Sequence, residues 1–217
     1  MRAWELRRAA AAVILPNRCP FCDELIGIRE FWCDRCYARL KLMEDPEEIP
    51  DGLDGFMSVC RYTGRARTAV LRMKKGYYRY PIDAFAVLIA ENAAPLIAAA
   101  DIITAVPTGK RRRRELGYAQ SEKMAKLVAE IAEKPFGRAL KVTEQKQEQK
   151  RLNAEQRREN ALHSYVLTDP KAVRGRNVLI IDDVCTTGST LGAIAALMKQ
   201  AGAKQVTGAV FAKTVRK

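Results

Sequence analysis

One stretch of sequence decides the fold of this 217-residue chain, Val178-Leu179-Ile180-Ile181-Asp182-Asp183-Val184-Cys185-Thr186-Thr187-Gly188-Ser189-Thr190-Leu191. Its first four residues are all apolar, which indicates a strand buried on both faces of a parallel sheet. Two carboxylates, several small hydroxyl residues and a glycine follow before helical spacing begins. Because ligands of open α/β sheets bind at the carboxyl ends of strands, the sequence predicts a ligand site in this segment.

The residue types in this segment indicate a phosphorylated sugar as the ligand. Backbone N–H groups at the start of a helix favour phosphate, and Gly188 lets the backbone approach it closely. Four hydroxyl groups add donors, those of Thr186, Thr187, Ser189 and Thr190. Asp182 and Asp183 would accept hydrogen bonds from sugar hydroxyls or bind magnesium through water. A ribose 5-phosphate fits this layout, and the alternative is a capped helix with two exposed acids.

Apolar runs and helical spacing alternate along most of the chain. We expect strands at 56–62, 101–106, 178–181 and 205–212, and helices at 64–75, 81–99, 121–132 and 189–200. Residues 110–114 are expected in a loop after a strand end. Strands separated by helices in this order predict an α/β fold with a mainly parallel sheet.

Four of the six cysteines form two Cys-x-x-Cys pairs separated by ten residues, Cys19, Cys22, Cys33 and Cys36. Such pairs can bind one structural zinc ion, which would supply the folding energy that a module without a core lacks. A redox dithiol and a rubredoxin-like iron site are the alternatives. We expect an N-terminal helix and zinc module at 1–43, an acidic linker at 44–55 and the α/β domain at 56–217.

The N-terminus carries a short apolar run at 9–15 behind several arginines. Glu5 lies in the charged part and Pro16 follows the run in place of a small-residue cleavage site, so we expect a short helix and not a secretion signal. No run of the sequence approaches the about 20 apolar residues that cross a bilayer. The expected location is cytoplasmic, where cysteines serve as metal ligands or free thiols.

The chain has a formal net charge of +13, from 38 Lys and Arg against 25 Asp and Glu. Such a surface attracts polyanions, and the positive charge is concentrated at 61–79, 110–114 and 138–158. Single-stranded nucleic acid is one candidate partner, with tyrosines among the cations as stacking platforms. The residues concerned are Lys74, Lys75, Tyr77, Tyr78, Arg111 and Arg113. The alternative is a solvated basic surface with the tyrosines packed inside.

Three ordered blocks and the four cysteines resemble the ComF family of the type I phosphoribosyltransferase superfamily. The first block is Asp-Asp-Val-x-Thr-Thr-Gly-x-Thr at 182–190. The second contains Val106, Pro107, Arg112, Arg114, Gly117, Tyr118 and Gln120. The third contains Gln149, Leu152, Arg157, Asn160 and Tyr165.

The resemblance implies a type I phosphoribosyltransferase-like fold and a ligand, phosphoribosyl pyrophosphate (PRPP). In that superfamily the hydroxyl-rich loop holds the 5′-phosphate, the acid pair holds the ribose, and magnesium bridges ribose and pyrophosphate. By position, Asp182 and Asp183 would contact the ribose, and Arg112 and Arg114 the pyrophosphate.

The resemblance also implies a role in the uptake of single-stranded DNA together with the DNA-uptake machinery. The sequence nominates no general base. Two hypotheses follow, a PRPP-binding protein that acts in DNA uptake and an active magnesium-dependent transferase with an unidentified acceptor.

Overall fold

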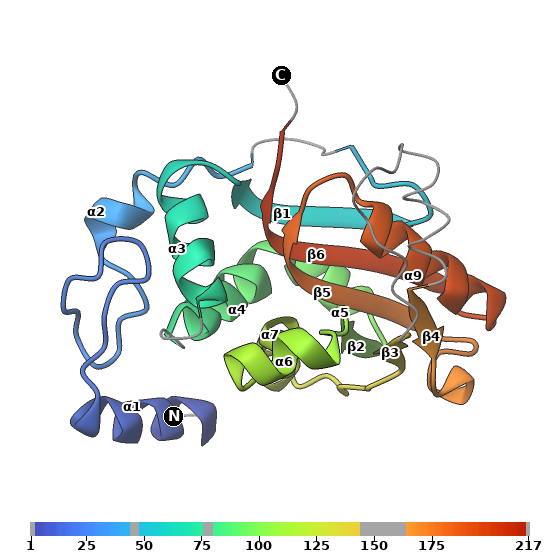
Figure 1. Ribbon diagram of the computed structural model, residues 1–217, viewed down its shortest axis with the longest axis horizontal. Helices are drawn as coiled ribbons and strands as arrows, with labels where there is room; N and C mark the ends of the chain where they lie inside the picture. Colours follow the sequence, from blue (N-terminus) through green and yellow to red (C-terminus); the bar gives the residue numbers. More distant parts are fainter. Residues whose placement is uncertain (1–2, 44–47, 76–79, 144–163, 216–217) are drawn as a thin grey trace.

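A four-stranded parallel sheet forms the centre of the protein, with the strand order β1-β6-β5-β2 (Figure 1). The computed structural model describes residues 3–43, 48–75, 80–143 and 164–215. The strands of the sheet are β1 (Gly55–Arg61), β2 (Ile102–Ala105), β5 (Asn177–Cys185) and β6 (Gln205–Lys213). A separate antiparallel pair is formed by β3 (Leu140–Val142) and β4 (Tyr165–Leu167). The predicted α/β fold with a parallel sheet is confirmed.

Helices cover both faces of the parallel sheet. Helices α3 (Gly64–Lys74), α4 (Tyr80–Asn92) and α7 (Gln120–Ile131) pack on one face. Helix α9 (Ser189–Gln200) packs on the other. Side chains of β5 alternate between these layers, with Leu179 and Ile181 in the first core and Val178 and Ile180 in the second. The unbroken apolar run in the sequence therefore reflects burial on both sides.

Two segments differ from the sequence-based expectation. The single helix expected at 81–99 is divided into α4 and α5 (Ala94–Ala99), because Pro95 has no N–H for the helical ladder and its ring clashes with the preceding turn. The loop expected at 110–114 is instead part of helix α6 (Lys110–Leu116), which ends at Gly117 with a left-handed φ of 72°. Its five successive cations leave no apolar stripe by which periodicity could reveal a helix.

The cysteine-bearing module packs directly onto the α/β domain. It contains α2 (Asp34–Tyr37), and it contributes the buried residues Cys19, Phe21 and Cys36 to the core on the α3 and α4 side of the sheet. Phe21 stacks on Phe211 of β6 with ring centroids 6.4 Å apart, and Phe211 stacks on Phe85 of α4 at 3.7 Å. The two parts share one core, and the boundaries 1–43, 44–55 and 56–217 stay a prediction.

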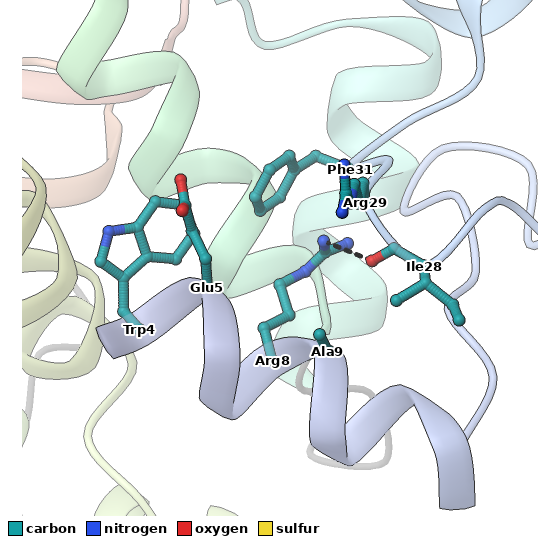
Figure 2. A pocket seen from close by; sticks show the side chains of 7 residues that line it. All are labelled: Trp4, Glu5, Arg8, Ala9, Ile28, Arg29 and Phe31. Carbon is teal, nitrogen blue, oxygen red and sulfur yellow. Dashed lines mark hydrogen bonds between the residues drawn. The ribbon is translucent and has the colours of Figure 1, made fainter. Parts of the chain in front are cut away.

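Helix α1 (Ala3–Ile14) forms at the N-terminus and is fixed to both parts of the protein. A cavity of about 630 Å³ lies between α1 and the loop that carries Ile28 and Phe31 (Figure 2). The Arg8 guanidinium lies 3.8 Å from the centroid of the Phe31 ring and donates to Ile28 O at 3.1 Å. Arg7 binds Glu130 of α7 at 2.7 Å. In the part of the chain that the structure describes, no helix is long and apolar enough to cross a membrane.

Candidate functional site

The segments after β2 and β5 emerge at the same edge of the sheet. These strands are parallel neighbours, with Ala105 opposite Ile181, and Val106 N donates to Ile181 O at 3.1 Å. The acid pair with its hydroxyl-rich loop therefore lies beside the segment that leads from Val106 into α6. This edge is where an open α/β sheet binds its ligands.

Strand β5 continues through the acid pair, so the prediction that it ends at Ile181 is wrong. The physical reason is β6, which runs alongside and pairs Asp182 with Val210 and Cys185 with Lys213. Strand β2 has already ended at Ala105. The carboxylates therefore lie on a part of β5 that pairs with β6 on one side and extends beyond the end of β2 on the other.

The two carboxylates have different partners. Ser121 Oγ, at the start of α7, donates to Asp182 Oδ1 at 2.7 Å, and the backbone N–H of Asp183 donates to the same oxygen at 2.9 Å. Lys74 Nζ, at the end of α3, lies 2.9 Å from Asp183 Oδ2. Asp183 is buried, with 7% of its surface exposed.

The environment of Asp182 favours its protonated form. Burial, together with the negative charge of Asp183, raises the pKa of Asp182 to about 7, although the hydrogen bond from Ser121 and the charge of Lys74 act in the opposite direction. A large part of the Asp182 carboxyl groups therefore carries a proton near neutral pH. The pair as a whole has less negative charge than two free carboxylates.

The hydroxyl-rich loop joins β5 to α9 in a tight turn. Gly188 is the N-cap of α9 and has a left-handed φ of 79°, which favours glycine. The hydroxyls of Thr187 and Ser189 are 2.8 Å apart, while Thr186 and Thr187 are exposed. Thr190 is hydrogen-bonded to the phenol of Tyr165 on β4, whose pKa is raised by burial. The structure thus brings the five predicted phosphate-loop residues together in one turn.

The segment before β1 lies directly on this turn. A Cβ atom placed on Gly188 would be 2.4 Å from Pro50 Cβ, and one placed on Gly192 would be 2.4 Å from Asp51 O. Lys213 Nζ at the end of β6 donates to Glu48 O at 2.7 Å. The backbone of the turn is therefore supported from one side, and Gly188 is buried although its neighbours are not.

The predicted basic residues occupy different places. Arg111, Arg113 and Arg114 are exposed on α6, where Arg111 pairs with Glu115 at 2.8 Å. Arg112 lies in the same helix, but its side chain is outside the described part of the chain. Lys75 is exposed, whereas Lys74 is engaged by Asp183.

Several predicted residues lie outside the described residues altogether. They are Tyr77 and Tyr78, and Gln149, Leu152, Arg157 and Asn160 of the third block. Sequence reasoning missed Ser121 and Pro50, and it did not connect Lys74 with the acids. The nearest signal was the second block, because Tyr118 and Gln120 immediately precede Ser121.

The four cysteines of the N-terminal module form a group that could hold a metal ion. Their Sγ atoms all lie within 4.8 Å of one another, and those of Cys22 and Cys33 are 3.7 Å apart. Tetrahedral zinc with Zn–S bonds of about 2.3 Å separates its sulfur ligands by about 3.8 Å, so the arrangement fits zinc. Arg65 Nη1, in the first turn of α3, donates to Cys36 Sγ at 2.9 Å. The α/β domain thus contacts the ligand group directly.

Two comparisons with known proteins match parts of the chain. A family model described as the phosphoribosyl transferase domain matches residues 119–217. The DNA utilization protein YhgH of Escherichia coli O157:H7 is 35% identical over 107 residues, which are 49% of this chain and 46% of that protein. Residues 119–217 of the chain are therefore similar to a phosphoribosyl transferase domain. The chain spans about half the length of the curated YhgH proteins it matches, and the one from strain K12 is 34% identical.

Three further similarities concern proteins whose names refer to phosphoribosyl transfer or to PRPP. The chain is 58% identical to the adenine phosphoribosyltransferase of Mycobacterium marinum over 41 residues, which are 19% of this chain and 22% of that one. Among solved structures, the glutamine PRPP amidotransferase from B. subtilis has a TM-score of 0.44 and 21% identity, over 59% of this chain and 25% of that chain. The purine phosphoribosyltransferase from Pyrococcus horikoshii has a TM-score of 0.39 and 22% identity, over 61% of this chain and 73% of that chain.

Proposed function

We propose that this protein is a ComF-type member of the phosphoribosyltransferase superfamily and that it binds PRPP or a related ribose 5-phosphate ligand at the carboxyl end of β5. The observation that carries the proposal is the continuity of the site. The acid pair, the hydroxyl-rich turn and the first turn of α9 follow one another on a single strand–loop–helix unit. The unit is supported by β6 and by the segment at Pro50, so its groups are arranged before a ligand arrives.

Each part of the unit suits one part of the ligand. The amides and hydroxyls of residues 186–190 would donate to the 5′-phosphate, which the positive end of the α9 dipole also favours. Asp182 and Asp183 would accept hydrogen bonds from the ribose hydroxyls. Arg112 and Arg114, on the helix that follows the neighbouring strand, would face the pyrophosphate, for which a guanidinium fork is suited. Magnesium, when bound, would offset the charge of the pyrophosphate.

The ligand proposal is tested by calorimetry with PRPP and magnesium. We expect binding by the wild type and its loss in the double variant Asp182→Asn/Asp183→Asn, which keeps the shape of both side chains. The matched control is Glu91→Gln/Glu133→Gln, which makes the same charge change at two exposed carboxylates on other elements. Binding that survives in the acid-pair variant would refute the proposed contacts, and a wild type that binds no PRPP would refute the ligand class.

Single-stranded DNA is the second partner that we propose, in the context of DNA uptake and its machinery. The supporting observation is the row of exposed cations on α6, where Lys110, Arg111, Arg113 and Arg114 face solvent. One pyrophosphate needs fewer positive charges than this helix offers. The similarity to proteins named for DNA utilization points in the same direction.

Fluorescence anisotropy with labelled single-stranded DNA tests this role. Binding through phosphates weakens linearly with the logarithm of the salt concentration, with a slope of about 0.7 per phosphate contact for single strands. Arg111→Ala/Arg113→Ala should weaken binding and reduce this slope by about 1.4. Lys171→Ala/Lys204→Ala removes two exposed cations elsewhere and should leave the slope unchanged. A salt response that is flat in the wild type would contradict the proposal.

Structural zinc is the third proposal, and it concerns the module of Cys19, Cys22, Cys33 and Cys36. The fit of their sulfur atoms to a tetrahedral ion supports it. Zinc bound there would hold the module in the shape that places Phe21 on Phe211. The ion would thereby contribute to the stability of the whole chain.

A further inference from the structure

Two buried side chains of the second sequence block hold the end of α3. Gln120 Nε2 donates to the backbone carbonyl of Met73 at 2.9 Å, and Tyr118 Oη donates to the same oxygen at 3.3 Å. Gln120 is 4% exposed and Met73 is fully buried. Carbonyls in the last turn of a helix have no partner within the helix, so these donors satisfy a group that would otherwise be costly to bury.

The residue that follows this anchored carbonyl is Lys74, which contacts the acid pair. Its Nζ is 2.9 Å from Asp183 Oδ2, and 27% of its side chain remains exposed. Ser121, which follows Gln120, donates to Asp182. One short segment, Tyr118 to Ser121, therefore holds Asp182 and the end of the helix that carries Lys74.

A cation is needed at this place if the ligand is anionic. Two adjacent carboxylates repel a phosphorylated ligand, and partial burial strengthens that repulsion because the local dielectric constant is low. An ammonium group on one carboxylate removes much of the repulsion. Asp183 still has a second oxygen and further lone pairs with which to accept a hydrogen bond from a ribose hydroxyl.

We propose that Lys74 is the counter-charge that allows an acid pair to serve in an anion-binding site, and that Gln120 and Tyr118 are its positioning residues. This inference rests on the proposed ligand class and deepens it. Lys74 lowers the repulsion between the pair and the ligand, and its exposed part is available to an anionic oxygen. Its role is thereby local to the sugar-phosphate site, in contrast to the nucleic-acid contact expected from the basic window 61–79.

The first experiment needs no ligand. Urea unfolding of the wild type, Lys74→Met, Asp183→Asn and the double variant forms a double-mutant cycle that reports whether the two side chains interact. We expect the effects to be non-additive, and we expect Gln120→Met to diminish the non-additivity because it frees the end of α3. Additive effects would overturn the assignment of Lys74, whether or not PRPP binds.

The second experiment measures PRPP affinity by calorimetry with magnesium. Lys74→Met should weaken binding by about 10- to 100-fold, the range of a hydrogen bond to a charged group, and Lys74→Arg should recover part of the loss. Gln120→Met should weaken binding less, and it should add nothing in the Lys74→Met background, because Gln120 acts through Lys74. Lys171→Met, the same change at an exposed lysine elsewhere, is the control.

The outcomes separate this inference from the proposed function. A wild type that does not bind PRPP overturns the proposed function, while the unfolding cycle still decides whether Lys74 balances the pair. A wild type that binds, with Lys74→Met binding equally or more tightly, overturns the inference alone. If Gln120→Met lowers PRPP affinity equally in the wild type and in the Lys74→Met variant, Gln120 does not act through Lys74. That result would overturn its positioning role.

Discussion

Replacing Gly188 by alanine tests the close contact between the hydroxyl-rich turn and Pro50. The alanine backbone would have to adopt a φ of 79°, and this conformation costs about 1–2 kcal/mol for a residue other than glycine. It would also lie 2.4 Å from Pro50 Cβ, and overpacking of this kind costs about 1–3 kcal/mol. We therefore expect Gly188→Ala to lower the free energy of unfolding by about 2–5 kcal/mol.

The chain offers a matched control for the backbone part of this loss. Gly175 has a φ of 70°, and nothing lies within 4 Å of the position that its Cβ would take. Gly175→Ala should therefore cost only the conformational part, about 1–2 kcal/mol. Adding Pro50→Gly to Gly188→Ala should recover most of the difference between the two variants, because it removes the atom that clashes.

The assay is urea unfolding followed by far-ultraviolet circular dichroism, with ligand affinity measured on the folded variants. Gly188→Ala should also weaken PRPP binding, because the turn must shift away from Pro50. Equal losses of stability in Gly188→Ala and Gly175→Ala would refute the reasoning. So would a double variant with Pro50→Gly in which the two costs simply add.

Three other outcomes follow from contacts described above. The pKa of Asp182 is raised to about 7, and the deprotonated carboxylate is the form that accepts ribose hydroxyls, so PRPP affinity should fall by up to about tenfold per pH unit as the pH drops below 7. Calorimetry on Asp182→Asn, which removes the titration of this carboxyl and keeps that of the ligand and of the other groups, gives the baseline. Parallel pH profiles of the two proteins would contradict the assignment. Metal analysis should find one zinc per chain, and Cys33→Ser should lower both the zinc content and the melting temperature. Cys60→Ser, at a buried cysteine outside the cluster, is the control and should leave the zinc content unchanged. Full retention of zinc in Cys33→Ser would argue against the site. Phe211→Ala removes the ring between Phe21 and Phe85 and should cost about 3–5 kcal/mol in urea unfolding, so a loss below about 1 kcal/mol would show that the stack contributes little.

The parts of the fold that the sequence predicts are those set by local pattern. The apolar run at 178–181 and the helix after Gly188 could be recognised because their neighbours in the chain determine them. The division of the helix at Pro95 was also within reach, since proline disrupts a helix wherever it stands inside one. The extension of β5 through Asp182 was not, because it depends on the length of β6, a strand that follows later in the chain.

The candidate site divides in the same way. The acid pair and the hydroxyl-rich turn are contiguous, so their residue types reveal them. Lys74 and Ser121 approach the acids from helices that are far away in sequence. The second block ends next to Ser121, but its residue types do not indicate a contact with Asp182. Pro50 reads as part of an acidic linker, and only the packing of its ring on Gly188 reveals its place beside the turn.

The pairing of β1 with β6 has a consequence for how the protein is made. β1 lies at an edge of the sheet and its neighbour there is β6. Phe21 stacks on Phe211, which also belongs to β6. During synthesis the N-terminal quarter leaves the ribosome long before its partner exists, and such distant pairings form slowly. A chain cut short before residue 205 would expose the edge of β1 and an aromatic face together, and would be a target for chaperones or proteases. The edge of β1 and the ring of Phe21 are therefore covered only after β6 has been made and has joined the sheet.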